Sequence, residues 1–310
     1  MKGFEYIKIK QRSWANRKKN QLLGGIIPDI GEKNYFKKLE DNLFQPLSSE
    51  IISQFENGDG NEMSDSVSRL AKMKALHSSS AIVVNFFQYW NDKDVYPILY
   101  ACNLCSKLPS GVEIMYENIG SKTPKIFSIS RNPLANTIIF EKKFKISNDT
   151  KQFPFSPNLD IVIGNFQSKI YAIESKFTEP YRSKPKGISK KYLENSSFWE
   201  GLPELCKLAN EICPNNNEYK YLDVAQLLKH IVGLKTNHSK SGFRLLYLWY
   251  DVIGQDGAKH RKEIEQFAEL AKKDNINFSH ITYQEVIIRL TEKFYGGNEM
   301  YCDYLVERYL

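Results

Sequence analysis

Long apolar runs are missing from this chain of 310 residues. The runs that do occur, such as Ala81 to Val84 and Leu245 to Leu248, are far shorter than the roughly 20 residues that a membrane helix needs. The N-terminal stretch is basic and lacks the apolar segment that marks a secretory signal. We therefore expect no membrane span and a cytoplasmic location.

Cysteine is scarce as well. The five cysteines, an odd number in a long chain, indicate reduced thiols rather than a disulfide framework. The one CxxC pair, Cys102 and Cys105, lacks the second pair that a structural zinc site requires. The sequence has no GxSxG, no P-loop and no HExxH, and its histidines show no metal-ligand spacing. These absences argue against serine-hydrolase, P-loop and zinc-protease chemistry.

Positive charge is what the chain has in excess, with a net charge of +7. Residues 1–30 carry a net +5, and residues 182–191 carry +5 with no acid at all, so the rest of the chain is net acidic. Clusters of this kind suit binding to a phosphate backbone, although a solvated lysine-rich surface is the alternative. The candidate DNA-contacting residues are Arg12, Arg17, Lys18, Lys19, Arg182, Lys184, Lys186, Lys190 and Lys191.

The order of the expected elements indicates an α/β fold. A polar break at 55–66 separates a basic N-terminal extension, residues 1–65, from a domain spanning residues 66–310. Apolar spacing and breaker residues predict helices at 66–90, 96–108, 198–212, 222–234, 259–273 and 284–294. The expected strands are 136–146, a hairpin within 158–177, 242–252 and 276–283. Strands that alternate with helices favour parallel pairing toward the C-terminal half.

The hairpin carries the residues with the clearest chemistry. Glu174 and Lys176 are two residues apart in one strand, so their side chains share a face. Asp160 lies opposite either Ile173 or Glu174, depending on the register. In the second register the two carboxylates are neighbours with Cβ atoms about 5 Å apart, and a divalent cation such as Mg²⁺ would relieve their repulsion.

Lys176 would then stand beside a metal and a phosphate. In that position an ammonium can orient or help deprotonate an attacking water and stabilise negative charge at phosphorus. The chemistry implied is phosphodiester hydrolysis. An ordinary hairpin face with a cross-strand salt bridge is the structural alternative.

This pattern, "SPNLD" followed by "IESK", resembles the active site of the PD-(D/E)XK nuclease superfamily, in its restriction-endonuclease-like branch. The stretches "HSSSAIVVNFFQYW" and "YLDVAQLLKHIVGL" extend the resemblance to about residues 70–285. The sequence departs from the named pattern because Leu159, not proline, precedes Asp160. Since that proline contacts no metal, the departure leaves the metal ligands unaffected.

The resemblance implies a restriction-endonuclease-like core, which is a central mixed sheet flanked by helices, behind a mainly helical N-terminal extension. It also implies metal ligands at Asp160 and Glu174, a catalytic lysine at Lys176, and a polar helix residue at Gln226. Glu141 is our choice for a further acidic residue. The implied cofactor is Mg²⁺, with Mn²⁺ as an alternative.

The function implied is a Mg²⁺-dependent endonuclease that cuts double-stranded DNA, of the type II restriction class. The implied partners are DNA, a second copy of the chain in a homodimer, and a cognate methyltransferase. Two alternatives stay open. One is a DNA repair or mobile-element nuclease of the same fold, and the other is a DNA-binding module without catalysis.

Overall fold

The computed structural model describes residues 1–58, 62–105, 113–117, 125–130, 138–166 and 169–310. Its helices are α1 Gly3–Arg17, α2 Ser49–Glu56, α3 Ser79–Phe87, α4 Tyr96–Ala101, α5 Glu179–Arg182, α6 Pro203–Glu211, α7 Val224–His238, α8 Gln255–Lys273, α9 Tyr283–Phe294 and α10 Glu299–Tyr309. Its strands are β1 Leu22–Leu23, β2 Tyr35–Phe36, β3 Glu113–Glu117, β4 Lys125–Ser130, β5 Ile138–Lys143, β6 Asn158–Phe166, β7 Lys169–Lys176, β8 Phe243–Trp249 and β9 Phe278–Thr282.

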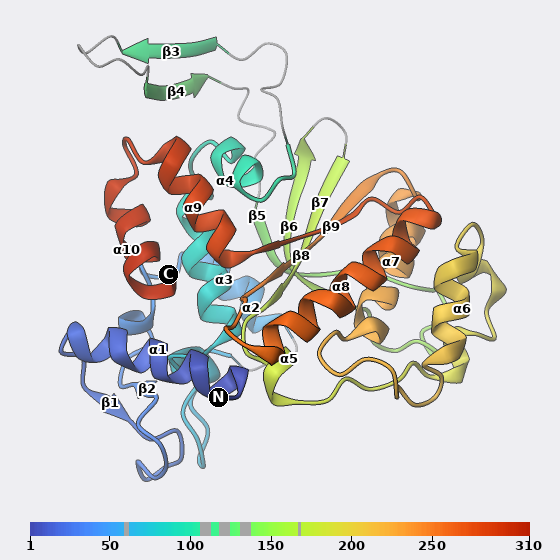
Figure 1. Ribbon diagram of the computed structural model, residues 1–310, viewed down its shortest axis with the longest axis horizontal. Coiled ribbons are helices and arrows are strands. Elements are labelled where there is room, and N and C mark those ends of the chain that lie inside the picture. Colours follow the sequence, from blue (N-terminus) through green and yellow to red (C-terminus); the bar gives the residue numbers. More distant parts are fainter. Residues whose placement is uncertain (59–61, 106–112, 118–124, 131–137, 167–168) are drawn as a thin grey trace.

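A five-stranded mixed sheet with the order β5-β6-β7-β8-β9 forms the centre of the molecule (Figure 1). The pairs β5–β6 and β6–β7 are antiparallel, whereas β7–β8 and β8–β9 are parallel. The strand β7 therefore lies where the sheet changes from antiparallel to parallel pairing. The predicted fold class, a central mixed sheet flanked by helices, is confirmed.

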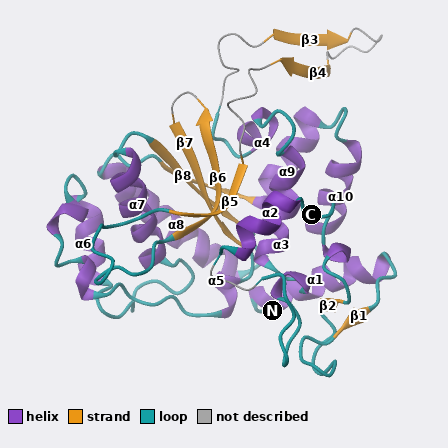
Figure 2. Cartoon of the chain, turned by 180° about the vertical axis from the view of Figure 1, so that it is seen from behind, coloured by secondary structure: helices purple, strands orange, loops and turns teal. Residues whose placement is uncertain are grey.

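Two apolar layers cover the sheet because alternate residues of each strand face opposite sides. On β7, Tyr171 and Ile173 belong to the core shared with α3, α9 and α10. Ala172 belongs to the core shared with α6, α7 and α8. Figures 1 and 2 show these two helix groups on opposite sides of the strands. The even-numbered side chains of β7 thus project toward the α7 layer, and this alternation decides where Glu174 points.

The N-terminal region is mainly helical, as expected, and it packs against the last helix. Ile7 of α1 is fully buried in the core that includes α9 and α10. Gln11 joins α1 to α10, since its amide donates to Arg308 O and its Oε1 accepts from Arg308 Nε, both at 3.0 Å. The division of the chain at residues 65/66 stays a prediction.

The helix predicted at 66–90 is wrong in its first half. The helix α3 begins at Ser79, where Ser78 accepts a hydrogen bond from Ala81 N and caps it. Before that point the backbone bonds instead to the N-terminal segment, with Leu70 N donating to Gly25 O and Leu76 N donating to Asn34 O. The apolar residues before Ser79 follow a helical spacing in the sequence, but they belong to an irregular segment that packs on the N-terminal region.

Two further predicted helices are shorter than expected, and the short helix α5 was not predicted. α4 ends at Ala101, and residues 106–108 of that prediction lie outside the described residues. The helix predicted at 198–212 is split, because Gly201 has a φ of +72° and Pro203 starts α6. The C-terminal helix α10 was not predicted from the sequence.

The predicted helix at 222–234 is confirmed as α7, with Asp223 as its N-cap. The Asp223 carboxylate accepts a hydrogen bond from Gln226 N at 2.9 Å. At the outer edge of the sheet, Phe140 N of β5 donates to Gln54 Oε1 of α2 at 2.7 Å. None of the helices in the described part of the chain is long and apolar enough to cross a membrane.

His260 of α8 belongs to a buried polar network between α8 and β8. Its Nδ1 lies 3.2 Å from Tyr181 OH, and its Nε2 lies 3.0 Å from Tyr247 OH. Tyr181 OH in turn donates to Tyr250 O. Burial lowers the pKa of His260 to about 3, with Lys176 and Arg261 contributing in the same direction. The folded protein therefore holds this imidazole neutral.

We predict that the free energy of unfolding decreases as the pH falls below about 6.5, the pKa of an unfolded histidine. Below this pH the histidine is protonated in the unfolded chain, whereas His260 in the folded protein stays neutral down to about pH 3. In His260→Gln, the slope of stability against pH between 6 and 4 should be smaller by up to about 1.4 kcal/mol per pH unit. Urea unfolding at several pH values measures this slope, and an unchanged slope would contradict the prediction.

Candidate functional site

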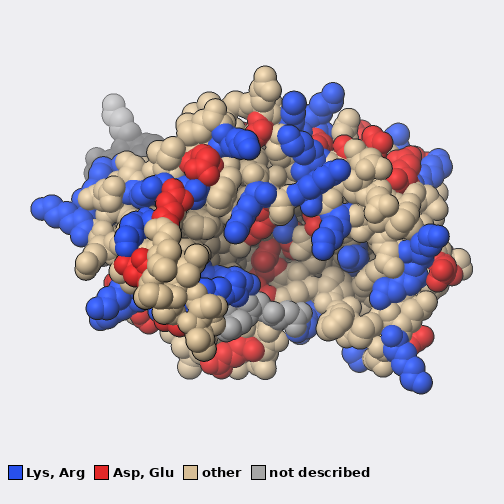
Figure 3. Space-filling model, turned by 90° about the horizontal axis from the view of Figure 1, so that it is seen from below, with Lys and Arg blue, Asp and Glu red and all other residues tan. Residues whose placement is uncertain are grey.

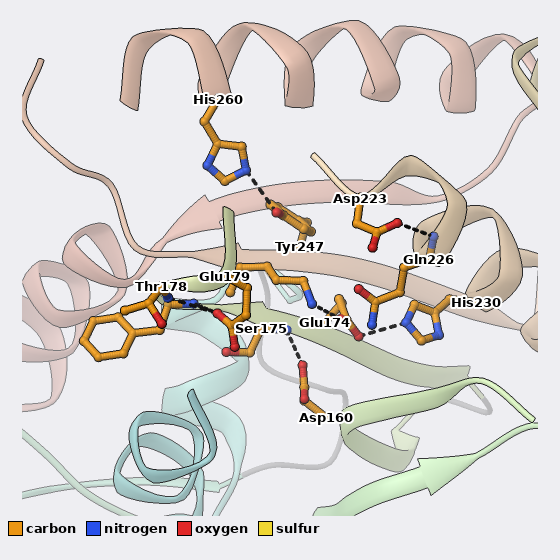
Figure 4. A network of polar contacts seen from close by, with 12 residues as sticks. Asp160, Glu174, Ser175, Thr178, Glu179, Asp223, Gln226, His230, Tyr247 and His260 are labelled. Atoms are coloured by element: carbon orange, nitrogen blue, oxygen red, sulfur yellow. Dashed lines mark hydrogen bonds and ion pairs between the residues drawn. The ribbon is translucent and has the colours of Figure 1, made fainter. Parts of the chain in front are cut away.

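The register of β6 and β7 places the hairpin carboxylates side by side. Ile161 pairs with Ile173, so the next position along the strands sets Asp160 opposite Glu174. Of the two registers that the sequence left open, the second is confirmed. At this end of the pair, Asp160 Oδ2 accepts a hydrogen bond from Ser175 N at 2.7 Å, as Figure 4 shows.

Glu174 is almost fully buried, with 1% of its surface exposed, and it lies between two nitrogen groups. Lys176 Nζ donates to Glu174 Oε1 at 2.6 Å, and His230 Nε2 of α7 lies 2.9 Å from Glu174 Oε2. Burial alone would raise the pKa of Glu174, but Lys176 and His230 outweigh burial and lower it to about 2. The side chain is therefore a carboxylate throughout the neutral range.

His230 is a residue of this site that sequence reasoning did not assign. It projects from α7 toward Glu174, one turn after Gln226 (Figure 4), and is only 2% exposed. Its contact with Glu174 has the length of an ion pair but not the geometry of a hydrogen bond. As a result, Glu174 Oε2 and both ring nitrogens of His230 have no hydrogen-bond partner among the described residues. The spacing of Gln226 and His230 on one helix face was the signal available in the sequence.

Asp160 has the opposite electrostatic situation. Burial raises its pKa well above the usual range, and the negative charges of Glu174 and Glu141 raise it further against the opposing effect of Lys176. The pKa of Lys176 is raised, because Glu174, Asp160 and Glu179 together outweigh the effect of burial. Glu174 is therefore firmly ionised and Lys176 firmly protonated, whereas the ionised form of Asp160 is disfavoured.

The two remaining predicted site residues come from neighbouring elements. Glu141 lies in β5, has a φ of +53°, and accepts a hydrogen bond from Asn158 Nδ2. Its charge acts on Asp160, so the structure brings these two carboxylates near each other. Gln226 stands at the start of α7, and its side chain points toward Glu174 in Figure 4.

Asp160 and Glu174 could hold a divalent cation. The observation in favour is the buried Glu174 Oε2 without a hydrogen-bond partner, next to an Asp160 carboxyl that is raised in pKa by like charges. Within the described residues, no three His, Cys, Asp or Glu side chains form a ready metal cage. Two carboxylates with water and phosphate oxygens completing the shell suit Mg²⁺ better than a closed zinc site.

Lys176 reaches a cleft with a volume of about 420 Å³. The loop after α5 contributes Lys184 and Lys186 to its wall, and α7 contributes Gln226 and Lys229. Figure 3 shows a central hollow on the face seen from below, with Asp and Glu at its floor and Lys and Arg around its rim. Lys176 is the residue of the Asp160, Glu174 and Lys176 group that lines the cleft, and the acids of the lining are Glu179 and Asp223.

Comparison with known proteins gives one positive result. A family model described as Restriction Endonuclease associating with ARP matches residues 9–310, nearly the whole chain. The chain belongs to this family. No curated protein and no solved structure matches the sequence. Membership in this family indicates a restriction-type nuclease.

In this restriction-endonuclease family member, the predicted DNA-contacting residues fall into two groups. Those in α5 and the loop after it lie around the Lys176 cleft or on the adjoining surface: Lys184 and Lys186 line the cleft, and Lys190 lines a neighbouring hollow. Lys191 donates to Gln152 O, and Arg182 lies over the ring of Phe4.

The N-terminal basic residues are engaged elsewhere. Arg12 pairs with Glu32 at 2.7 Å, and Lys18 pairs with Glu307. Arg17 donates to Ser13 Oγ and to the Glu307 carbonyl oxygen. Neither these three residues nor Lys19 lines the cleft around Lys176.

We predict that Asp160→Asn stabilises the metal-free protein. At neutral pH the ionised Asp160 is destabilised by burial and by two like charges, whereas an amide oxygen can still accept from Ser175 N. Because the folded-state pKa is raised, the penalty appears as the pH rises above the unfolded value and is present at pH 7. The melting temperature in EDTA should rise by about 2 °C or more.

The exposed residue Asp92 supplies the control, since Asp92→Asn removes the same charge away from the site. A lower melting temperature in Asp160→Asn, with that of Asp92→Asn unchanged, would show that the Asp160 carboxylate stabilises the folded protein. That result would contradict the prediction.

Proposed function

We propose that the protein is a Mg²⁺-dependent endonuclease that hydrolyses phosphodiester bonds in double-stranded DNA, as a type II restriction enzyme of the PD-(D/E)XK superfamily. One observation carries the proposal. Asp160, Glu174 and Lys176 meet where β6 begins and β7 ends, beside an open cleft with a lysine-rich wall. The family match supports the restriction class.

Lys176 acts on the scissile phosphate as a cation. Its raised pKa keeps the ammonium protonated at neutral pH, so it stabilises the charge that develops on phosphorus rather than removing a proton from water. Its Nζ is also held by Glu174 at 2.6 Å, which fixes its direction. Of the three roles considered for this lysine, charge stabilisation and orientation of the water fit its raised pKa, whereas deprotonation of the water does not.

Asp160 and Glu174 hold the metal in this proposal. When bound, a Mg²⁺ ion would polarise a phosphate oxygen and lower the pKa of the attacking water. Glu174 would keep Oε1 on Lys176 and offer Oε2, and Asp160 would lose the repulsion that raises its pKa. Gln226 lines the same cleft and is positioned to contact substrate, and Glu141 adds negative charge on the β5 side.

The partners follow from this chemistry. Two copies of the chain related by two-fold symmetry would match the symmetry of duplex DNA, and a cognate methyltransferase would protect the host sites. The family is described as associating with ARP, and we extend that association to this chain as part of the proposal. Lys184 and Lys186 would contact the phosphate backbone near the cut.

The direct test is incubation of plasmid and phage DNA with the purified protein, with Mg²⁺, with Mn²⁺ and with EDTA. Discrete fragments that appear only with metal support the proposal. A smear would favour a nonspecific nuclease, and intact DNA under all conditions would refute catalysis.

We predict that Lys176→Ala lowers the rate of plasmid cleavage by about 100-fold or more, because the charge developing on phosphorus loses its protein cation. DNA binding measured by fluorescence anisotropy should change little, since the lysines of the loop remain. Lys169→Ala, at the opposite end of the same strand, is the matched control and should cut normally. Equal rates for the two variants would rule out a catalytic Lys176.

We also predict that His230 positions Glu174. His230→Phe keeps the ring volume but removes the nitrogen 2.9 Å from Glu174 Oε2, so the carboxylate loses one of its two fixed neighbours. The Mg²⁺ concentration for half-maximal cleavage should rise by about tenfold, because a less well oriented Glu174 binds the metal more weakly. His230→Gln, which offers an amide donor, should recover part of the change. An unaltered metal dependence in His230→Phe would contradict this role.

A further inference from the structure

A second cavity, with a volume of about 520 Å³, adjoins the cleft around Lys176. The two share Pro180, Ser183, Lys184 and Tyr221, so they lie on either side of one wall. The proposed reaction does not use the second cavity. Its volume falls within the range of roughly 300–1,000 Å³ that small-molecule sites occupy.

The charge of the cavity lining is strongly positive. Lys2, Arg182, Lys184 and Lys220 line it, and within the described residues none of the four is in an ion pair with an acid. These cations come from the N-terminal segment, from α5 and the loop after it, and from the segment before α7. Segments that are distant in sequence therefore converge to leave unpaired positive charge at one place.

The single acidic residue of the lining cannot neutralise that charge easily. Asp256 Oδ2 accepts from Gly3 N, and Asp256 Oδ1 accepts from Tyr221 OH, both at 2.8 Å. Both carboxylate oxygens are thus occupied by donors of the protein. A bound anion would face four cations and an acid that is already hydrogen-bonded.

Three tyrosines also line the cavity, and hydrogen bonds fix the hydroxyl groups of two of them, Tyr181 and Tyr221. Tyr181 OH is held by Tyr250 O and His260, and Tyr221 OH is held by Asp256. A Cβ atom at Gly3 would come within 2.8 Å of the Tyr181 ring, so α1 packs directly against it. Lys220 Nζ lies 5.1 Å from the centre of the Tyr221 ring. Aromatic walls that are held in place before binding reduce the ordering cost of a ligand.

We propose that this cavity binds a nucleoside phosphate, with the phosphate on the cations and the base against the tyrosine walls. Cations with aromatic rings are the groups that proteins use for single nucleotides and unpaired strands. The ligand is either a nucleotide of the DNA displaced from the duplex beside the cut, or a free nucleotide. The first source deepens the proposed nuclease function, and the binding itself does not depend on it.

Isothermal titration at low salt with dAMP and dTMP tests the binding. Deoxyadenosine and inorganic phosphate are the reference ligands, because each lacks one half of the proposed recognition. The double variant Lys2→Glu with Lys220→Glu changes two exposed residues that line this cavity and not the Lys176 cleft. It should bind the nucleotides roughly tenfold more weakly or worse. Lys38→Glu, an exposed charge reversal outside the cavity lining, should bind like the wild type.

Cleavage assays separate the two sources. If DNA supplies the nucleotide, excess dAMP or dTMP slows plasmid cleavage competitively, and the double variant has a raised KM for DNA with little change in kcat. If the ligand is a free nucleotide, binding by titration leaves the KM for DNA unchanged. Both outcomes support the site. Absence of nucleotide binding by the wild type together with an unchanged KM in the double variant would overturn it, as would equal nucleotide binding by the wild type and the double variant.

The titration also separates this inference from the nuclease proposal. Lys176→Ala should retain nucleotide binding, because Lys176 does not line the second cavity. A protein that binds dAMP but cuts no DNA would leave the cavity assigned and the nuclease proposal refuted. If the wild type cuts DNA but binds no nucleotide, and the double variant has a normal KM for DNA, the nuclease proposal would stand and the nucleotide site would be refuted.

Discussion

The negative charge of Glu174 is the constraint on which the site depends. A buried carboxylate is expensive unless cations or donors surround it. Lys176 supplies one partner from the same strand, and His230 supplies the other from α7. The helix and the strand are therefore joined by electrostatics as well as by apolar packing, and the direction of Lys176 toward the cleft follows from the same contact.

Asp160 shows what this arrangement costs. Glu174 has its charge compensated, whereas Asp160 is left with burial and with like charges from two neighbours. Perturbed carboxyls of this kind gather where proteins bind cations or carry out chemistry, because a ligand removes the strain on binding. The fold thus keeps the two carboxylates unequal in the absence of metal. That inequality would disappear once a shared cation lay between them.

The sequence was sufficient for the parts of the site that depend on strand geometry. Glu174 and Lys176 share a face because they are two residues apart, and the capped helix α7 followed from Asp223 and its apolar stripe. It was not sufficient for His230, because the rotation of α7 about its axis is set by packing against the sheet. The helix predicted from residue 66 failed for a similar reason: the segment up to His77 forms only short turns of its own and is held by backbone bonds to residues near Gly25 and Asn34. The walls of the second cavity come from four separate segments, which no local pattern could bring together.

The contact between Gln54 and β5 has a consequence for assembly. An edge strand offers unpaired backbone donors and acceptors, which a strand from another chain can use to extend the sheet. On β5 the outward-facing amide of Phe140 is already taken by a glutamine side chain from α2. A neighbouring molecule that added a strand there would have to displace that helix first. Extension of the sheet by a strand paired at Phe140 is therefore incompatible with the present position of α2.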